Sequence, residues 1–139
     1  AWVLSAEQIP QKVAEMMLGV SKDPYFILFL INVFLLIVGM FMEGGAAIII
    51  LAPVLAQVAN SVGIHPLHFG FVMVLNLTLG LLTPPLGVCL FVACGIARIS
   101  LEKLFKAIYP FLIVEMGVLF LCSYLPEVVL WIPRLVGYI

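Results

Sequence analysis

Gly80-Leu-Leu-Thr-Pro-Pro-Leu-Gly87 interrupts an apolar stretch that runs from about Leu67 to Ala97. Pro84 and Pro85 supply no backbone N–H, and a proline disfavours the α region for the residue before it, so a helix must open here. In hydrocarbon, an opened backbone is tolerated only where protein buries it or where it lines a wet cavity. Two readings follow. The break holds a substrate or coupling ion, as in transporters, or it is a plain proline kink or loop between two short buried helices.

The composition indicates a membrane protein. Hydrophobic residues make up 65% of the chain and charged residues 9%, whereas a soluble domain carries about 25% charged residues. A net charge of −1 offers no basic face, so we expect no nucleic-acid partner. The three cysteines lie in apolar runs without metal-ligand spacing and are interpreted as small hydrophobic residues. Because the chain opens with Ala1 and shows no signal-peptide pattern, we expect a fragment of a longer protein.

The first part of the chain, residues 1–22, is the only amphipathic one. Ile9 and Val13 recur at helical spacing, and Lys12 and Glu15 turn the other way. A short helix of this kind lies in the membrane interface rather than crossing the bilayer.

Two apolar runs follow, and they allow two arrangements. Tyr25–Met42 carries no charge and is long enough to span a bilayer, whereas Ala46–Val58 is short for a span. Either the first run crosses the membrane and Glu43 sits in the far interface, or the two runs form a re-entrant hairpin. In the hairpin, Gly39–Gly45 is a tip near the bilayer centre. Residues 57–66 are expected to form a polar loop.

The rest of the chain predicts a broken transmembrane helix over Leu67–Ala97 and a final span over Ala107–Leu125. The loop Arg98–Lys106 holds three of the six basic residues and is therefore predicted to be cytoplasmic. The C-terminus is then external, in a short tail that Trp131 and Tyr138 anchor at the interface. The expected parts are an interfacial arm helix (1–22), a hairpin with a broken helix (23–98), and a loop, last span and tail (99–139).

Glu43 is the strongest candidate for a functional residue, because placing a carboxylate inside a membrane costs free energy and such residues are often functional. Flanking glycines let backbone carbonyl groups turn toward a cation, and Na⁺ prefers oxygen ligands, which the tip and Thr83 supply. The alternative is an interfacial glutamate that needs no partner. Asn76, Gly80 and Thr83 share one helix face, which turns away from lipid.

Other polar residues are better explained by structural roles than by chemistry. Glu115 either relays protons or, as we favour, reaches the nearby interface or bonds a neighbouring helix. His65 and His68 are assigned loop and capping roles rather than a metal pair, since no third ligand is near. The sequence has no nucleophile–base arrangement, phosphate loop or nucleotide fingerprint, so neither an enzyme nor an ATPase is expected.

Several segments together resemble the C-terminal part of the large membrane subunit of TRAP (tripartite ATP-independent periplasmic) transporters, the DctM-like permeases. The resemblance covers nearly the whole chain. It is carried by Gly39–Pro53, Gly63–Gly70, Gly80–Gly87, Leu90–Ala97 and Tyr109–Phe111.

This resemblance implies an all-α membrane fold that is half of an inverted-repeat, elevator-type transporter. It favours the hairpin arrangement. It also implies Na⁺-coupled uptake of organic acids, such as dicarboxylates or sialic acid, across the bacterial inner membrane. The implied partners are a periplasmic binding protein, a small membrane subunit, the rest of the large subunit and the lipid bilayer.

The resemblance further implies two sets of site residues. Those of the Na⁺ site are Gly39, Met42, Glu43, Thr83 and Pro84. Those of the substrate site are Asn76, Thr83, Pro85 and Gly87. Some members of that family have Asp at the position of Glu43. Because the Glu side chain is longer, Glu43 coordinates Na⁺ directly, coordinates it through a water molecule, or contacts the residues that coordinate it. Two other functions remain open, namely a proton-coupled carrier that titrates Glu43 or Glu115 and a membrane scaffold without transport.

Overall fold

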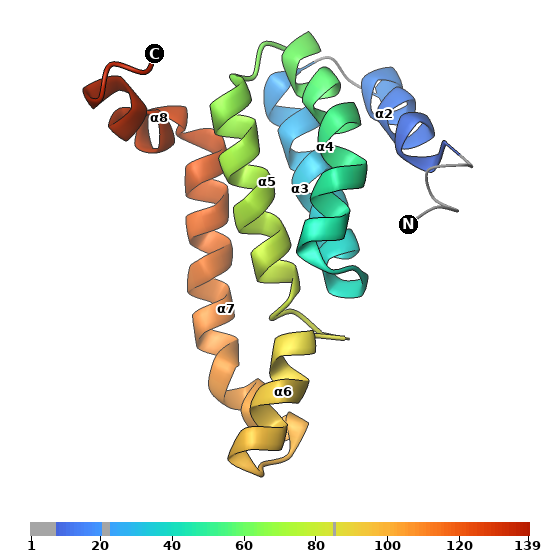
Figure 1. Ribbon diagram of the computed structural model, residues 1–139, viewed down its shortest axis with the longest axis vertical. Coiled ribbons are helices and arrows are strands. Elements are labelled where there is room, and N and C mark those ends of the chain that lie inside the picture. Colours follow the sequence, from blue (N-terminus) through green and yellow to red (C-terminus); the bar gives the residue numbers. More distant parts are fainter. Residues whose placement is uncertain (1–7, 21–22, 85) are drawn as a thin grey trace.

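The computed structural model describes residues 8–20, 23–84 and 86–139, and this part is helical without a strand. Three of its helices, α3, α4 and α7, are long and apolar enough to cross a membrane. The prediction of an all-α membrane protein is therefore confirmed. The helices are α2 (Ile9–Val20), α3 (Pro24–Phe41), α4 (Gly44–Ser61), α5 (Pro66–Gly80), α6 (Val88–Ala97), α7 (Leu101–Tyr124) and α8 (Pro126–Leu135) (Figure 1).

Helices α3 and α4 form a helical hairpin, running antiparallel with only Met42 and Glu43 between them (Figure 1). Asp23 starts α3 by accepting a hydrogen bond from the amide of Tyr25 at 3.1 Å, and Pro24 follows at the first helical position, where a missing N–H does no harm. The two helices have 18 residues each.

The structure corrects the expected end of the second run. It is not a short segment followed by a polar loop at residue 57, because α4 continues to Ser61. The Ser61 hydroxyl donates to the carbonyl of Val58 at 2.7 Å, which satisfies a polar side chain within the last turn. Pro53 lies inside α4 without ending it.

The chain opens between α5 and α6, as the prolines predict. The amides of residues 81–83 each donate to the carbonyl three residues earlier, at 3.0–3.2 Å, so the helix ends in tight turns. Gly87 then takes a left-handed conformation (φ 45°) before α6, and a Cβ at this position would lie 2.8 Å from the Leu90 side chain. Pro85 lies outside the described residues, as do residues 1–7 of the expected arm helix.

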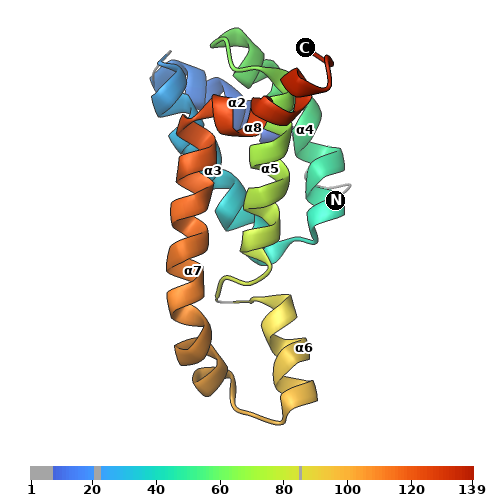
Figure 2. The same ribbon diagram turned by 90° about the vertical axis from the view of Figure 1, so that its left-hand side faces the viewer.

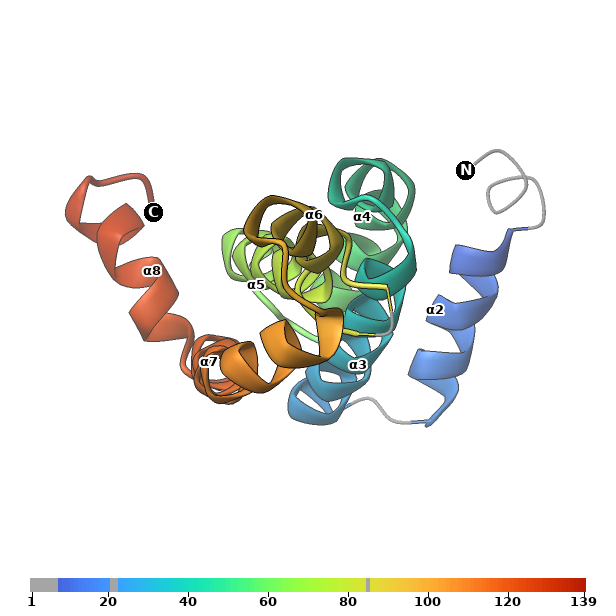
Figure 3. The same ribbon diagram turned by 90° about the horizontal axis from the view of Figure 1, so that it is seen from below.

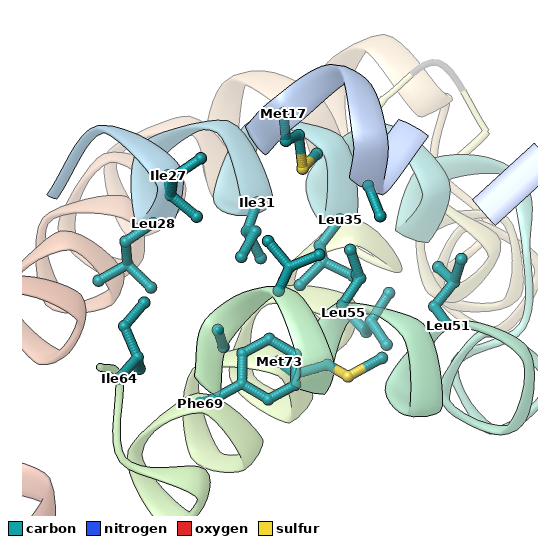
Figure 4. Packing of buried hydrophobic residues seen from close by; sticks show 14 of the residues in the cluster. Met17, Ile27, Leu28, Ile31, Leu35, Leu51, Leu55, Ile64, Phe69 and Met73 are labelled. Atoms are coloured by element: carbon teal, nitrogen blue, oxygen red, sulfur yellow. The ribbon is translucent and has the colours of Figure 1, made fainter. Parts of the chain in front are cut away.

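Helices α3, α4 and α5 share one apolar core, to which α2 adds Met17 (Figure 4). Ile27, Ile31 and Leu35 on α3 are fully buried, as is Leu55 on α4. Within a membrane such packing gains van der Waals contact, because lipid tails are as apolar as these side chains. The hairpin and α5 therefore form one packed unit.

The longest helix, α7, extends beyond this unit at one end. It has 24 residues, or about 36 Å at 1.5 Å per residue. The hairpin tip and the end of α5 lie about midway along it, and α6 lies beside its first half (Figures 1 and 2). The predicted cytoplasmic loop is shorter than expected, because α7 starts at Leu101.

Helices α2 and α8 lie on opposite sides of the bundle, and both run largely across its long axis (Figure 3). The sequence assigns residues 126–139 to a tail, but Pro126–Leu135 is helical, with Pro126 at a first-turn position that tolerates its missing N–H. Trp131, Ile132 and Leu135 are each more than 60% exposed on α8.

Candidate functional site

The hairpin tip and the break are far apart in sequence, yet their backbones touch. A Cβ added to Gly80 would lie 2.6 Å from both the Cα and the carbonyl carbon of Gly39. A Cβ added to Gly39 would lie 3.1 Å from the Cα of Gly80. Small residues at such a crossing let two helices approach more closely than any side chain allows. The structure therefore brings the two segments that the sequence singles out into one place.

Glu43 caps the start of α4 at this tip. Its Oε1 accepts a hydrogen bond from the amide of Gly45 at 2.8 Å, and its Oε2 accepts one from Ala46 at 2.9 Å. A carboxylate is favoured at a helix N-terminus, where amides and the helix dipole are positive. Glu43 is exposed in the described part of the chain. Each oxygen keeps a further acceptor position, since an ionised carboxylate has about four.

Thr83 lies in the break, half-buried. Its hydroxyl donates to the carbonyl of Leu79 at 2.8 Å, which leaves the oxygen free to accept a donor or a cation. Within the described residues, no hydrogen bond reaches the carbonyl groups of residues 81–84. Thr83 and Pro84 also line a cleft of about 350 Å³ between α3, α5 and α7. Its lining is almost wholly apolar, so the cleft alone does not suit an organic anion.

The last turns of α3 and α5 meet at this contact, and α4 begins three residues after α3 ends. Helix C-termini favour cations. At the end of α5 the carbonyl groups of residues 78–80 accept amides in tight turns, so the carbonyl groups without a described partner are those of residues 81–84 in the break. The first turns of α4 and α6 begin just after the tip and the break, and such ends favour anions. This is the arrangement in which broken helices hold coupling ions and anionic substrates.

Asn76 lies one turn before Gly80 and is fully buried. Its Nδ2 donates to both the backbone carbonyl and the Oδ1 of Asn32, at 2.9 Å each. The contact with substrate that the resemblance implies for Asn76 and Gly87 stays a prediction. Met42, by contrast, is at the tip, where its amide closes the last turn of α3 on Val38 at 2.8 Å.

Sequence reasoning missed Asn32 and Ser123. Both are buried, and the Nδ2 of Asn32 donates to the Ser123 hydroxyl at 2.9 Å. The available signal was a lone amide inside the apolar run 25–42, because polar residues within a membrane segment pair with something.

Three polar residues to which the sequence assigns ordinary structural roles, His65, His68 and Glu115, can now be placed. His65 caps α5, with its Nδ1 accepting from the amide of Leu67 at 3.2 Å, so its capping role is confirmed. The loop or capping role predicted for His68 is wrong, because His68 is buried within α5 and its Nε2 lies 2.7 Å from the carbonyl oxygen of Cys122. Glu115 is half-buried in α7, beside a cavity of about 170 Å³ that Thr78 also lines. Its Oε2 is buried and has no hydrogen-bond partner among the described residues. Glu115 thus bonds no neighbouring helix in this part of the protein.

Comparison with known proteins gives consistent matches. A family model described as "Tripartite ATP-independent periplasmic transporter, DctM component" matches residues 1–128. The chain is 44% identical, over 126 residues, to the isethionate TRAP transporter permease protein DctMQ of Oleidesulfovibrio alaskensis, covering 91% of this chain and 20% of that protein.

Two further relatives match almost the whole chain. It is 40% identical over 138 residues to the sialic acid TRAP transporter large permease protein SiaM of Vibrio cholerae, covering 99% of this chain and 32% of SiaM. It is 39% identical over 137 residues to the C4-dicarboxylate TRAP transporter large permease protein DctM of Pseudomonas aeruginosa, again covering 99% and 32%. The chain thus spans about a fifth to a third of the length of these relatives.

Proposed function

Because the chain belongs to the DctM component family of tripartite ATP-independent periplasmic transporters, we propose that it forms an ion-binding part of a permease in the bacterial inner membrane. The family consists of transporters, not enzymes, which confirms the prediction of a non-enzyme. Since the chain spans at most a third of these three relatives, the rest of a large subunit completes the transport path.

The proposed activity is uptake of an organic acid driven by a Na⁺ gradient. The relatives are named for isethionate, sialic acid and C4-dicarboxylates, which are all organic anions. The substrate is delivered by a periplasmic binding protein, and a small membrane subunit completes the assembly. The hairpin, α5 and α6 move together across the membrane as an elevator.

In this proposal the hairpin is re-entrant, with both ends on the external side. Helix α7 is long enough to cross a hydrocarbon core of about 30 Å, and the tip lies midway along α7 (Figures 1 and 2). The tip and the break then lie near the bilayer centre, where irregular backbone is tolerated only beside protein or water.

The observation that carries the proposal is the Gly39–Gly80 contact, which brings the ends of α3 and α5 together. We assign the Na⁺ ligands to carbonyl groups at the end of α3, to those of residues 81–84 in the break, and to the Thr83 hydroxyl. Glu43 holds the tip in shape and adds negative charge nearby. The first turn of α6 attracts the acidic group of the substrate, because Glu43 already occupies the amides at the start of α4.

The test is uptake into proteoliposomes that contain the full permease, its small subunit and its binding protein. Isethionate, sialic acid and a C4-dicarboxylate are offered separately, with Na⁺ and pH gradients varied independently. We expect accumulation of one of these anions with an inward Na⁺ gradient at equal pH. Accumulation that follows the pH gradient without Na⁺ would contradict Na⁺ coupling. It would support the proton-coupled alternative, which the unpartnered Oε2 of Glu115 favours.

A further inference from the structure

Three buried polar side chains form a chain of hydrogen bonds across α5, α3 and α7. The Nδ2 of Asn76 donates to the Oδ1 of Asn32, and the Nδ2 of Asn32 donates to the Ser123 hydroxyl, each at 2.9 Å. The Ser123 hydroxyl in turn donates to the carbonyl of Leu119 at 2.7 Å. All three polar residues are at most 2% exposed. None of them belongs to the tip or the break.

This chain is not the arrangement that would stabilise the helices most. The Oδ1 of Asn76 is buried and has no partner among the described residues. A buried acceptor without a partner costs about 1–3 kcal/mol. Apolar residues of similar volume at both positions would avoid this cost, and such replacements are often neutral or stabilising. A role other than stability is therefore indicated.

The best-attested role of a buried amide between helices is to fix their register. Asn32 lies two turns before Gly39 on α3, and Asn76 lies one turn before Gly80 on α5, so each amide shares a helix face with its glycine. Both helices run in the same direction along the bundle (Figure 1). A slide of α3 by one turn along α5 would break both bonds to Asn32 and move Gly39 away from Gly80.

We propose that Asn32 and Asn76 are positioning residues for the ion site. They fix α3 on α5 in the one register that places the hairpin tip against the break, and neither side chain binds the ion or the substrate. The inference deepens the proposed function and rests on it for the nature of the site. It gives Asn76 a role different from the contact with substrate that the resemblance implies.

Single and double leucine variants separate register from stability. Asn76→Leu leaves the Oδ1 of Asn32 without its donor. Asn32→Leu removes one of the two acceptors of the Asn76 amide, which keeps the backbone carbonyl of residue 32, and it also removes the donor to Ser123. Each single variant should lower the midpoint of thermal unfolding of the purified full-length permease. The double variant buries neither amide, and Ser123 keeps its bond to Leu119. Its unfolding midpoint should return to the wild-type value or exceed it.

Register is measured directly as the distance between the tip and the region after the break. Nitroxide labels at Phe41 and Leu86, both exposed, are placed in the full-length permease after replacement of the native cysteines. Double electron–electron resonance should give one narrow distance distribution for the otherwise wild-type protein. We expect the double variant, although stable, to give a broadened or displaced distribution. In uptake assays its half-saturating Na⁺ concentration should rise at least tenfold.

The matched control is Thr78→Val on the same helix, whose hydroxyl bonds only its own helix, at the carbonyl of Val74. It should change neither the distance nor the Na⁺ dependence. A double variant that keeps both the narrow distance and the wild-type Na⁺ dependence would overturn the inference, because the amides would then act on stability alone. If wild-type uptake does not depend on Na⁺, the proposed function fails, and the distance distribution still decides whether the amides set the register.

Discussion

At the scale of single residues, Glu43 illustrates how one side chain can serve a site without occupying its centre. Both of its carboxylate oxygens accept amide hydrogen bonds from the first turn of α4. A shorter carboxylate is an equally good helix cap. Glu43→Asp should therefore keep the shape and the charge of the tip, whereas Glu43→Ala removes both.

We expect Glu43→Ala to raise the half-saturating Na⁺ concentration about fivefold or more, since a lost cap costs about 1 kcal/mol. Glu43→Asp should stay within about twofold of wild type, by the same argument from capping. The measurement is Na⁺-dependent uptake by the full complex at saturating substrate. If aspartate does as much damage as alanine, the reach of the Glu43 side chain matters, and direct coordination replaces capping as its role.

The glycine contact makes a second prediction at this scale. Gly80→Ala puts a methyl group 2.6 Å from the backbone of Gly39, so α3 and α5 must move apart. Overpacking of this kind costs about 1–3 kcal/mol. We expect a lower unfolding midpoint for the purified permease and a weaker response of uptake to Na⁺.

Gly70 on the same helix supplies the control, because a Cβ added there meets nothing within 4 Å. Gly70→Ala should be neutral or stabilising by up to about 1 kcal/mol, the difference in helix propensity. Equal effects of the two alanines would mean that the close crossing has no special importance.

At the scale of elements, the sequence predicted the break better than the helix ends. Pro84 and Pro85 remove backbone donors, and that local effect places the end of α5 whatever packs around it. The length of α4 was not predictable in the same way. Its polar last turn is typical of a loop in sequence, but Val58 and Ala59 in that turn are buried in the shared core.

The partners of buried amides are also beyond local sequence patterns. Asn32 and Ser123 are 91 residues apart, and no periodicity links them. The capping role of Glu43 was predictable from the sequence, since a carboxylate before two glycines and an apolar run is an ordinary helix start. Because a carboxylate at membrane depth is often functional, the sequence favoured an ion-binding role for Glu43 instead. The ligand set itself stays a prediction.

The hairpin makes a prediction about topology. If α3 and α4 are re-entrant, their outer ends face the same side of the membrane. Single cysteines at Tyr25 and Asn60, both exposed, should then react with a membrane-impermeant maleimide added from the external side. The assay is done on intact cells that carry the full transporter, with Ile99→Cys, in the loop predicted to be cytoplasmic, as the control expected to stay unlabelled. Labelling of the two hairpin positions from opposite sides would contradict the re-entrant hairpin. Glu43 would then lie at the far membrane interface and not near the bilayer centre.

At the scale of the whole molecule, the described residues leave large apolar surfaces exposed. Helix α6 and much of α7 expose large apolar side chains, among them Phe91, Ile96, Phe111 and Val114. Lipid or the remainder of a large subunit suits these surfaces, in keeping with the share of the relatives that the chain covers. An organic anion also needs polar groups that the cleft beside Thr83 lacks. The other part of the large subunit is the natural source of those groups.

Ion binding to the whole permease can be tested without transport. A ligand that binds only the folded protein stabilises it by about 2.7 kcal/mol at a concentration one hundred times its dissociation constant. The unfolding midpoint of the purified full-length permease should therefore be higher in NaCl than in KCl of equal ionic strength.

If the Thr83 oxygen is a ligand, Thr83→Val should weaken Na⁺ binding roughly 10- to 150-fold, taking the lost contact as about 1.5–3 kcal/mol. Thr83→Ser keeps the oxygen and should keep the stabilisation. Equal midpoints of the wild type in the two salts would exclude a Na⁺ site in the isolated permease. A sodium effect that survives Thr83→Val unchanged would exclude the Thr83 oxygen and leave the backbone carbonyl groups of the tip and the break, together with Glu43, as the candidate ligands from this chain.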